Sequence, residues 1–138
     1  SCNELFGAAS HLVQTASALR YPVFIDGENY NGTPKMTKHP LLCEQLINNF
    51  GEDVQALPNA VFLPLGDKVS EALQFLSKQG LLDSDRIIGG LPHPSPANAE
   101  RIAYFLGKKR REELSVKTNP EKIDMARQEI MARVMSLV

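Results

Sequence analysis

Alternating prolines constrain this chain more than any other feature. In the stretch Leu91–Asn98 every second position from 92 to 96 is proline. Each proline fixes its own φ and biases the residue before it away from helix. An apolar run, Ile87–Gly90, precedes the stretch, and an amphipathic segment, Ala99–Lys109, follows it. The pattern predicts a strand, a stiff loop and then a helix.

The predicted helix would start within this loop. Ser95 or Asn98 is a good N-cap, and Pro96 suits a first helical turn. A helix N-terminus presents free N–H groups and a partial positive charge, which favour a phosphate. His93 places one neutral hydrogen-bond donor in the middle of this loop. The loop is therefore a candidate nucleotide-binding element.

A second strand is predicted upstream. The continuous apolar run Ala60–Leu65 is typical of a strand buried on both faces. Asp67 is expected to cap the next helix, which Gly80 would end, and Arg86–Ile88 is the next strand. A strand, helix and strand in about 30 residues indicate a parallel pair with a right-handed crossover. Ligands bind at the carboxyl ends of such strands, where His93 would lie.

Other segments have clear local patterns. Asp26-Gly27 predicts a type I′ hairpin turn, and the end of the hairpin groups Asn29, Tyr30 and Asn31, whose ring and amides could contact unpaired bases. His11–Thr15 is expected to be a short strand or, alternatively, a helix. A helix is predicted at Thr37–Phe50, with Pro40 in its first turn and Gly51 at C′. A C-terminal helix is predicted at 118–138, capped by Thr118 with Glu121 or by Asn119 with Pro120.

Composition and charge bound the class of protein. The length of 138 residues predicts a single domain, 1–138, with a real core. No apolar run is long enough to span a membrane. Cys2 and Cys43 are expected to be free thiols in a reducing, cytoplasmic compartment, although one disulfide stays an alternative. Residues 86–111 contain six basic residues and one acidic residue. This basic block predicts an electropositive surface around the His93 loop, although its last residues also suit a helix C-terminus.

The run His93-Pro94-Ser95-Pro96-Ala97-Asn98 resembles motif 2 of the uracil-DNA glycosylase superfamily. The single-strand-selective branch of that superfamily is the most similar, because its motif also has an asparagine at the position of Asn98. The resemblance extends more weakly over residues 11–107. It implies an α/β fold, a three-layer αβα architecture with a mostly parallel central sheet, of which this chain would be the C-terminal part with the N-terminal portion missing.

The resemblance also implies an activity, which is hydrolysis of the N-glycosidic bond of uracil or a related damaged base in DNA. This reaction would need no cofactor and no metal. The catalytic residue would be His93, donating to the pyrimidine O2 as negative charge develops there. The partner would be DNA, with single-stranded DNA as one candidate, and no membrane is implied. The substrate-binding residues would be Ser95, Asn98, Pro94, Ala97, Thr15 and Ser17, and the nucleic-acid contacts Arg101, Lys108 and Lys109.

Several residues depart from the superfamily pattern. The run Thr15–Pro22 has no asparagine to read the base edge, and Ala97 replaces the leucine that fills the emptied stack in double-strand-specific relatives. Nothing in residues 1–10 resembles the first motif, which positions the attacking water, so this chain alone is expected to lack full activity. The alternatives are a non-catalytic nucleic-acid-binding module, an unrelated nucleotide-binding or hydrolase α/β domain with a His93 and Ser95 nucleophile pair, and a plain scaffold.

Overall fold

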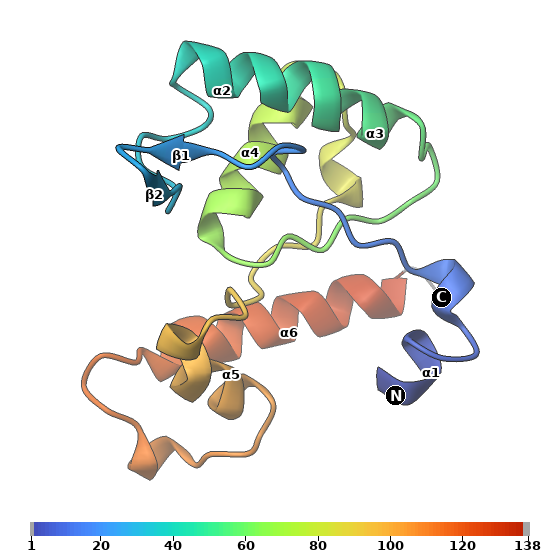
Figure 1. The fold of residues 1–138 in the computed structure, drawn as a ribbon. Coiled ribbons are helices and arrows are strands. Elements are labelled where there is room, and N and C mark those ends of the chain that lie inside the picture. The colour runs from blue at the N-terminus through green and yellow to red at the C-terminus, as the bar shows by residue number, and fades with distance from the viewer. Residues whose placement is uncertain (1, 137–138) are drawn as a thin grey trace.

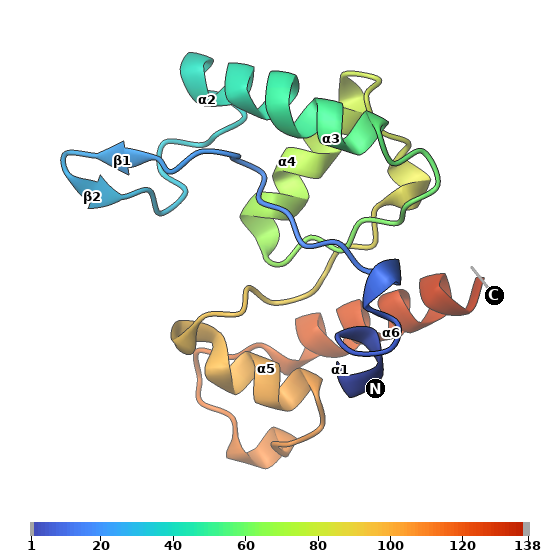
Figure 2. The ribbon, with the colours of Figure 1, turned by 45° about the vertical axis from the view of Figure 1, so that its right-hand side comes forward.

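The structure, a computed structural model, describes residues 2–136 and consists mainly of helices (Figure 1). Helices α2–α4 and the strands form an upper group, and α5 and α6 lie below it in both ribbon views (Figures 1 and 2). The longer elements are α1 (Cys2–Leu5), β1 (Phe24–Ile25), β2 (Glu28–Asn29), α2 (Pro40–Gln45), α3 (Gly51–Gln55), α4 (Asp67–Lys78), α5 (Ala99–Phe105) and α6 (Pro120–Ser136). Short helical turns are η1 (Ser10–Leu12), η2 (Leu46–Phe50), η3 (Ser84–Arg86), η4 (Pro96–Asn98) and η5 (Arg111–Glu113).

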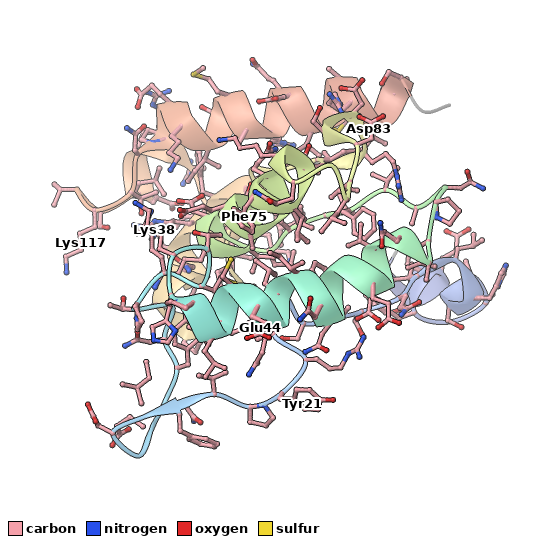
Figure 3. The ribbon with its side chains drawn as sticks, turned by 90° about the horizontal axis from the view of Figure 1, so that it is seen from above. Tyr21, Lys38, Glu44, Phe75, Asp83 and Lys117 are labelled. Atoms are coloured by element: carbon pink, nitrogen blue, oxygen red, sulfur yellow. The ribbon has the colours of Figure 1, made fainter. Side chains whose placement is uncertain are left out.

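The core lies between the helix that runs through α2, η2 and α3 and the helix α4. Seen from above, α4 lies between that helix and α6 (Figure 3). The largest fully buried side chains all come from these elements, namely Leu46, Val54, Leu73 and Leu76. Their spacing of three and eight residues keeps them on one face of each helix. Burial of this apolar face drives the packing, at roughly 1.5–3 kcal/mol for each fully buried Leu or Val.

The β1–β2 hairpin is confirmed. Phe24 pairs with Asn29 and Ile25 with Glu28 in an antiparallel register. Asp26 (φ 50°) and Gly27 (φ 82°) both have positive φ, as a type I′ turn requires. The segment that follows β2 is held to α4, because Lys68 Nζ donates to the Asn31 carbonyl at 2.5 Å.

The prediction of a three-layer αβα fold with a mostly parallel central sheet is wrong. Within residues 2–136 the only sheet is the two-stranded antiparallel β1–β2 pair. The segments 60–65 and 86–91 do run parallel, but they share only isolated bridges, Phe62 with Ile87 and Leu65 with Leu91. Pro64 lies between these bridges and has no N–H to donate, so a continuous ladder cannot form there.

The other predicted strand also differs. Residues 10–12 form the turn η1, and the chain that follows it, through residue 17, is extended but belongs to neither strand of the sheet. Every residue from 10 to 17 is exposed, so this apolar run gains little from burial within the described chain. The sequence also allowed a helix at His11–Thr15, but the structure has only the single turn η1 there.

Helix boundaries separate the correct predictions from the incorrect ones. Pro40 lies in the first turn of α2, as predicted, but the helix begins at Pro40 and not at Thr37. Gly51 has helical φ and ψ, so the helix continues to Gln55 and does not end at Gly51. Gly66, and not Asp67, is the residue before α4, and no side chain caps this end. Of the two predicted caps of α6, the structure has Asn119, whose Oδ1 accepts from Lys122 N at 3.0 Å.

The lower group is joined to the upper group through residue 90. A Cβ built on Gly90 would lie 3.0 Å from Ala126 Cβ, so α6 packs directly on the backbone there. Tyr104 of α5 donates to Asp124 of α6 at 2.9 Å. None of the helices described in 2–136 is both long and apolar enough to cross a membrane. Leu137, expected on the apolar face of the last helix, lies outside the described residues.

Candidate functional site

The His93 loop begins where the two parallel segments end. Gly66 N donates to the Leu91 carbonyl at 3.0 Å, which fixes the end of one segment to the end of the other. His93 follows two residues later and is exposed. A Cβ on Gly66 would lie only 2.8 Å from His93 Cβ, and Gly66 has φ +99°. Glycine at position 66 therefore allows both the backbone turn and the close approach of His93.

Asn98 holds the loop closed. Its Nδ2 donates to the His93 carbonyl and to Ser95 Oγ, both at 3.1 Å, and its Oδ1 accepts from Arg101 at 2.7 Å. The backbone adds Ser95 N to the His93 carbonyl at 2.8 Å and Asn98 N to the Ser95 carbonyl at 2.9 Å. The backbone of His93 is thus fixed while the residue stays exposed. This is the arrangement that a positioned hydrogen-bond donor needs.

Both predicted cap positions exist, although neither side chain makes a cap bond. Ser95 precedes η4, in which Pro96 is the first residue, and Asn98 precedes α5. Ser95 is half-buried, whereas Pro94 and Ala97 are exposed. The loop therefore enters the helix as predicted, but the side chains of Ser95 and Asn98 bond within the loop.

The predicted basic surface is largely neutralised within the molecule. Lys109 Nζ lies 2.8 Å from Glu100 Oε1, Arg110 pairs with Glu113 at 3.6 Å, and Arg111 contacts Glu121. Arg101 is exposed but bonds Asn98 and, at 3.3 Å, the Lys117 carbonyl. Of the residues predicted to contact nucleic acid, Lys109 is in an ion pair, whereas Arg101 and Lys108 are in none within residues 2–136.

Glu100 accepts most of the hydrogen bonds that hold the segment between α5 and α6. Besides Lys109, it accepts from Ser115 Oγ at 2.7 Å, from Ser115 N at 3.1 Å and from Thr118 Oγ1. The Lys109 ammonium, followed by the Thr118 and Ser115 donors, holds the pKa of Glu100 well below its usual range. The ionised carboxylate thus ties the start of α5 to the loop before α6.

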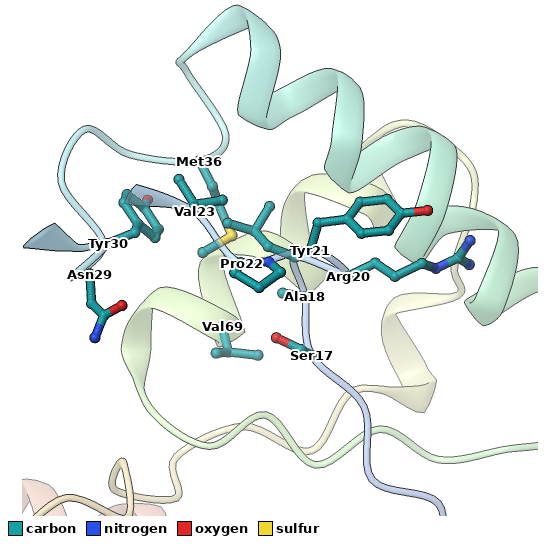
Figure 4. A pocket seen from close by; sticks show the side chains of 11 residues that line it. Ser17, Ala18, Arg20, Tyr21, Pro22, Val23, Asn29, Tyr30, Met36 and Val69 are labelled. Carbon is teal, nitrogen blue, oxygen red and sulfur yellow. The ribbon is translucent and has the colours of Figure 1, made fainter. Parts of the chain in front are cut away.

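An open hollow of about 470 Å³ lies beside the first turn of α4 (Figure 4). Figure 4 shows Ser17 and Val69 at one side of it and Tyr30, Val23 and Met36 at the other. Burial raises the pKa of Tyr30, whose hydroxyl donates to the Pro34 carbonyl at 2.6 Å. The remaining lining residues are Ala18, Leu19, Arg20, Tyr21, Pro22 and Asn29.

The structure divides the predicted substrate-binding residues into two groups. Ser95 and Asn98 are bonded to each other beside His93, whereas Ser17 lines the hollow and Thr15 is exposed outside it. Helix α4 joins the groups, because Gly66 before it contacts His93 and Val69 in its first turn lines the hollow.

Sequence patterns missed part of this arrangement. Asn29 and Tyr30 line the hollow as the hairpin cluster suggested, while the Asn31 side chain accepts from Thr33 N instead. Neither Gly66 as the contact of His93 nor Tyr21 as a lining residue was predicted. Gly66 carried a detectable signal, because a glycine at the end of an apolar run marks a turn or a close approach.

Comparisons with known proteins give one relative and no assigned function. No protein-family model matches the chain, and no solved structure matches it significantly. The chain is similar to the uncharacterized protein YoxB of Bacillus subtilis strain 168, with 31% identity over 128 residues. The match covers 91% of this chain and 50% of YoxB, so the chain spans about half the length of that relative.

Proposed function

We propose that this chain binds a nucleotide of DNA at the His93 loop and belongs to a DNA glycosylase-like protein that removes uracil or a related base. The observation that carries the proposal is the His93 loop itself, in which an exposed imidazole follows a backbone fixed by Gly66 and Asn98. The resemblance of residues 93–98 to the glycosylase motif supports the same reading.

The proposed reaction needs a donor and little else from this loop. Breaking the bond between base and sugar leaves electrons on the pyrimidine O2. A neutral imidazole N–H aimed at that oxygen stabilises the developing charge. His93 would supply this donor, and the Asn98 bonds to the backbone of His93 would prevent it from moving away as the base departs. The attacking water would be positioned by residues outside this loop.

The hollow beside α4 supports a base-sized ligand. Its volume of about 470 Å³ is within the range of small-molecule sites. Tyr30 and Tyr21 offer rings, and Asn29 and Ser17 offer hydrogen-bonding groups. Rings that stack on bases and amides that read base edges are the usual means of binding an unpaired base. A single-stranded ligand fits better than a duplex, because the methyl side chain of exposed Ala97 is too small to fill an emptied stack.

A base-release assay with a matched histidine control tests this proposal. A 5′-labelled oligonucleotide with one deoxyuridine, single-stranded or paired, is incubated with the chain and with YoxB, and alkali then cleaves abasic sites. His93→Ala should lower the rate about 100- to 1,000-fold, like loss of an oxyanion-hole donor, while the affinity for the oligonucleotide changes less than about threefold. His39→Ala, at an exposed histidine with no cap bond, should change neither.

The assay also separates the alternatives. Binding to oligonucleotide without base release by either protein would favour a non-catalytic module. Equal release by wild type and His93→Ala would refute the role of the imidazole. Absence of both binding and release, for the chain and for YoxB, would refute the whole proposal.

A further inference from the structure

The apolar run 60–65 is only half covered within the described chain. Its side chains alternate, because Pro64 is buried and Phe62 packs against the core, while Val61, Leu63 and Leu65 are 37%, 53% and 44% exposed. Exposure of three large apolar side chains at every second position of one extended segment is unusual. It indicates a strand face that a partner covers.

The backbone of the same residues is unpaired on one edge. Phe62 uses its N–H and its carbonyl on the inner side, bonding Arg86 O at 2.8 Å and Ile88 N at 2.9 Å, and Gly66 N bonds Leu91 O at 3.0 Å. Alternation along a strand then directs the groups of Val61, Leu63 and Leu65 to the opposite edge. Among residues 2–136 no backbone hydrogen bond is made by their N–H groups.

We propose that the outer edge of residues 61–65 pairs with an additional β-strand, supplied by sequence that the longer relative carries outside the matched half. A strand is the fitting occupant, because a row of free N–H and C=O groups is satisfied by another extended backbone and not by a helix. Its inner side chains would be apolar, to cover Leu63 and Leu65. The length supports this source, since the match takes up only 50% of YoxB.

The segment is already rigid enough to receive a strand. Arg86 Nε donates to the Ala60 carbonyl at 2.8 Å, its guanidinium also bonds the Leu57 carbonyl, and the group lies 5.2 Å from the centre of the Phe62 ring. These contacts fix the inner side of the segment to η3. The outer edge is therefore held extended before a partner binds, which lowers the ordering cost of pairing.

Amide hydrogen exchange followed by NMR tests this inference on the 138-residue chain and on full-length YoxB. In the chain, the amides of Val61, Leu63 and Leu65 should exchange rapidly, and the Phe62 amide, which is bonded on the inner side, should be protected. In YoxB, the amides aligned with all four residues should be protected, the outer three by at least 100-fold more than in the chain. Fast exchange of the outer amides in YoxB would refute the proposal.

A substitution pair distinguishes this surface from ordinary exposed leucines. Leu63→Lys should leave the melting temperature of the chain unchanged, and lysine at the aligned position of YoxB should lower it. Leu41→Lys, at a leucine of α2 with 57% exposure, is the matched control and should do neither. Protection of the outer amides in the chain that grows with its concentration would assign the edge to a second copy and overturn the proposed occupant.

Discussion

Asn98 offers the sharpest test of how the His93 loop is held. Its amide donates two hydrogen bonds within the loop, at 3.1 Å each, and accepts one from Arg101 at 2.7 Å. A neutral hydrogen bond contributes about 0.5–1.5 kcal/mol. We count the exposed Arg101 bond at the low end, since solvent weakens it. Asn98→Ala should therefore lower the free energy of unfolding by about 1.5–3.5 kcal/mol, or the melting temperature by roughly 5–12 °C for a domain of this size.

The same substitution should affect base release more than binding. Loss of both bonds from Asn98 Nδ2 leaves the His93 carbonyl held by Ser95 N alone and frees Ser95 Oγ, so the imidazole is held less firmly. A misplacement of about 1 Å can cost up to about 100-fold, and we expect a fall in rate of about 10- to 100-fold in whichever protein releases base. Thermal unfolding and the oligonucleotide assay measure the two effects.

Two further variants decide which bond matters. Asn98→Asp keeps an acceptor for Arg101 but loses both donors, so it should behave like Asn98→Ala. If Asn98→Asp instead behaves like wild type, the Arg101 bond holds the loop and the reasoning fails. Asn59→Ala, at an exposed asparagine in the turn before residue 60, is the control and should change neither the melting temperature nor the rate.

Two other predictions concern charge. Because the pKa of Glu100 is lowered in the folded state, its stabilisation is complete above the unfolded value of about 4.3 and is lost as pH falls below it. The difference in melting temperature between wild type and Glu100→Gln should be largest at neutral pH and should shrink below about pH 4. The control Glu112→Gln should change the melting temperature little at any pH. A difference for Glu100→Gln that does not depend on pH would contradict the role of the ionised carboxylate. For single-stranded DNA, the log–log salt slope of affinity should be no steeper than about −1.4, as for two phosphate contacts, because Lys109, Arg110 and Arg111 are paired internally. A slope near −4 would mean that these pairs open to bind phosphate.

Local patterns predicted local structure well. Asp26-Gly27 predicted the type I′ turn, Pro40 the first turn of α2, and the proline-rich stretch a loop that leads into a helix. In each case the decisive preference is a steric property of one or two residues, so it does not depend on the rest of the chain. The sheet could not be predicted this way, because a strand needs a partner and the patterns of Ala60–Leu65 and His11–Thr15 do not reveal whether one is present.

The candidate site shows the same division. The order from His93 to Asn98 predicted the loop, but the contact of His93 with Gly66 joins positions 27 residues apart, and no short pattern contains it. Charge was misread for a similar reason. The count over residues 86–111 is strongly basic, yet Arg111 pairs with acidic residues of α6 beyond that window. Net charge along the chain describes a surface only when the pairing across the fold is known.

The paired cations change how the proposed ligand would be held. If Lys109 and Arg111 stay in their internal ion pairs, the affinity for DNA must come mainly from stacking and base contacts in the hollow, and less from phosphate. Such a site would favour an unpaired base over a continuous duplex, because a stacked, paired base presents no free ring face to Tyr30. For the proposed ligand, the internal ion pairs and the small side chain of Ala97 would therefore both favour a single strand, by independent physical routes.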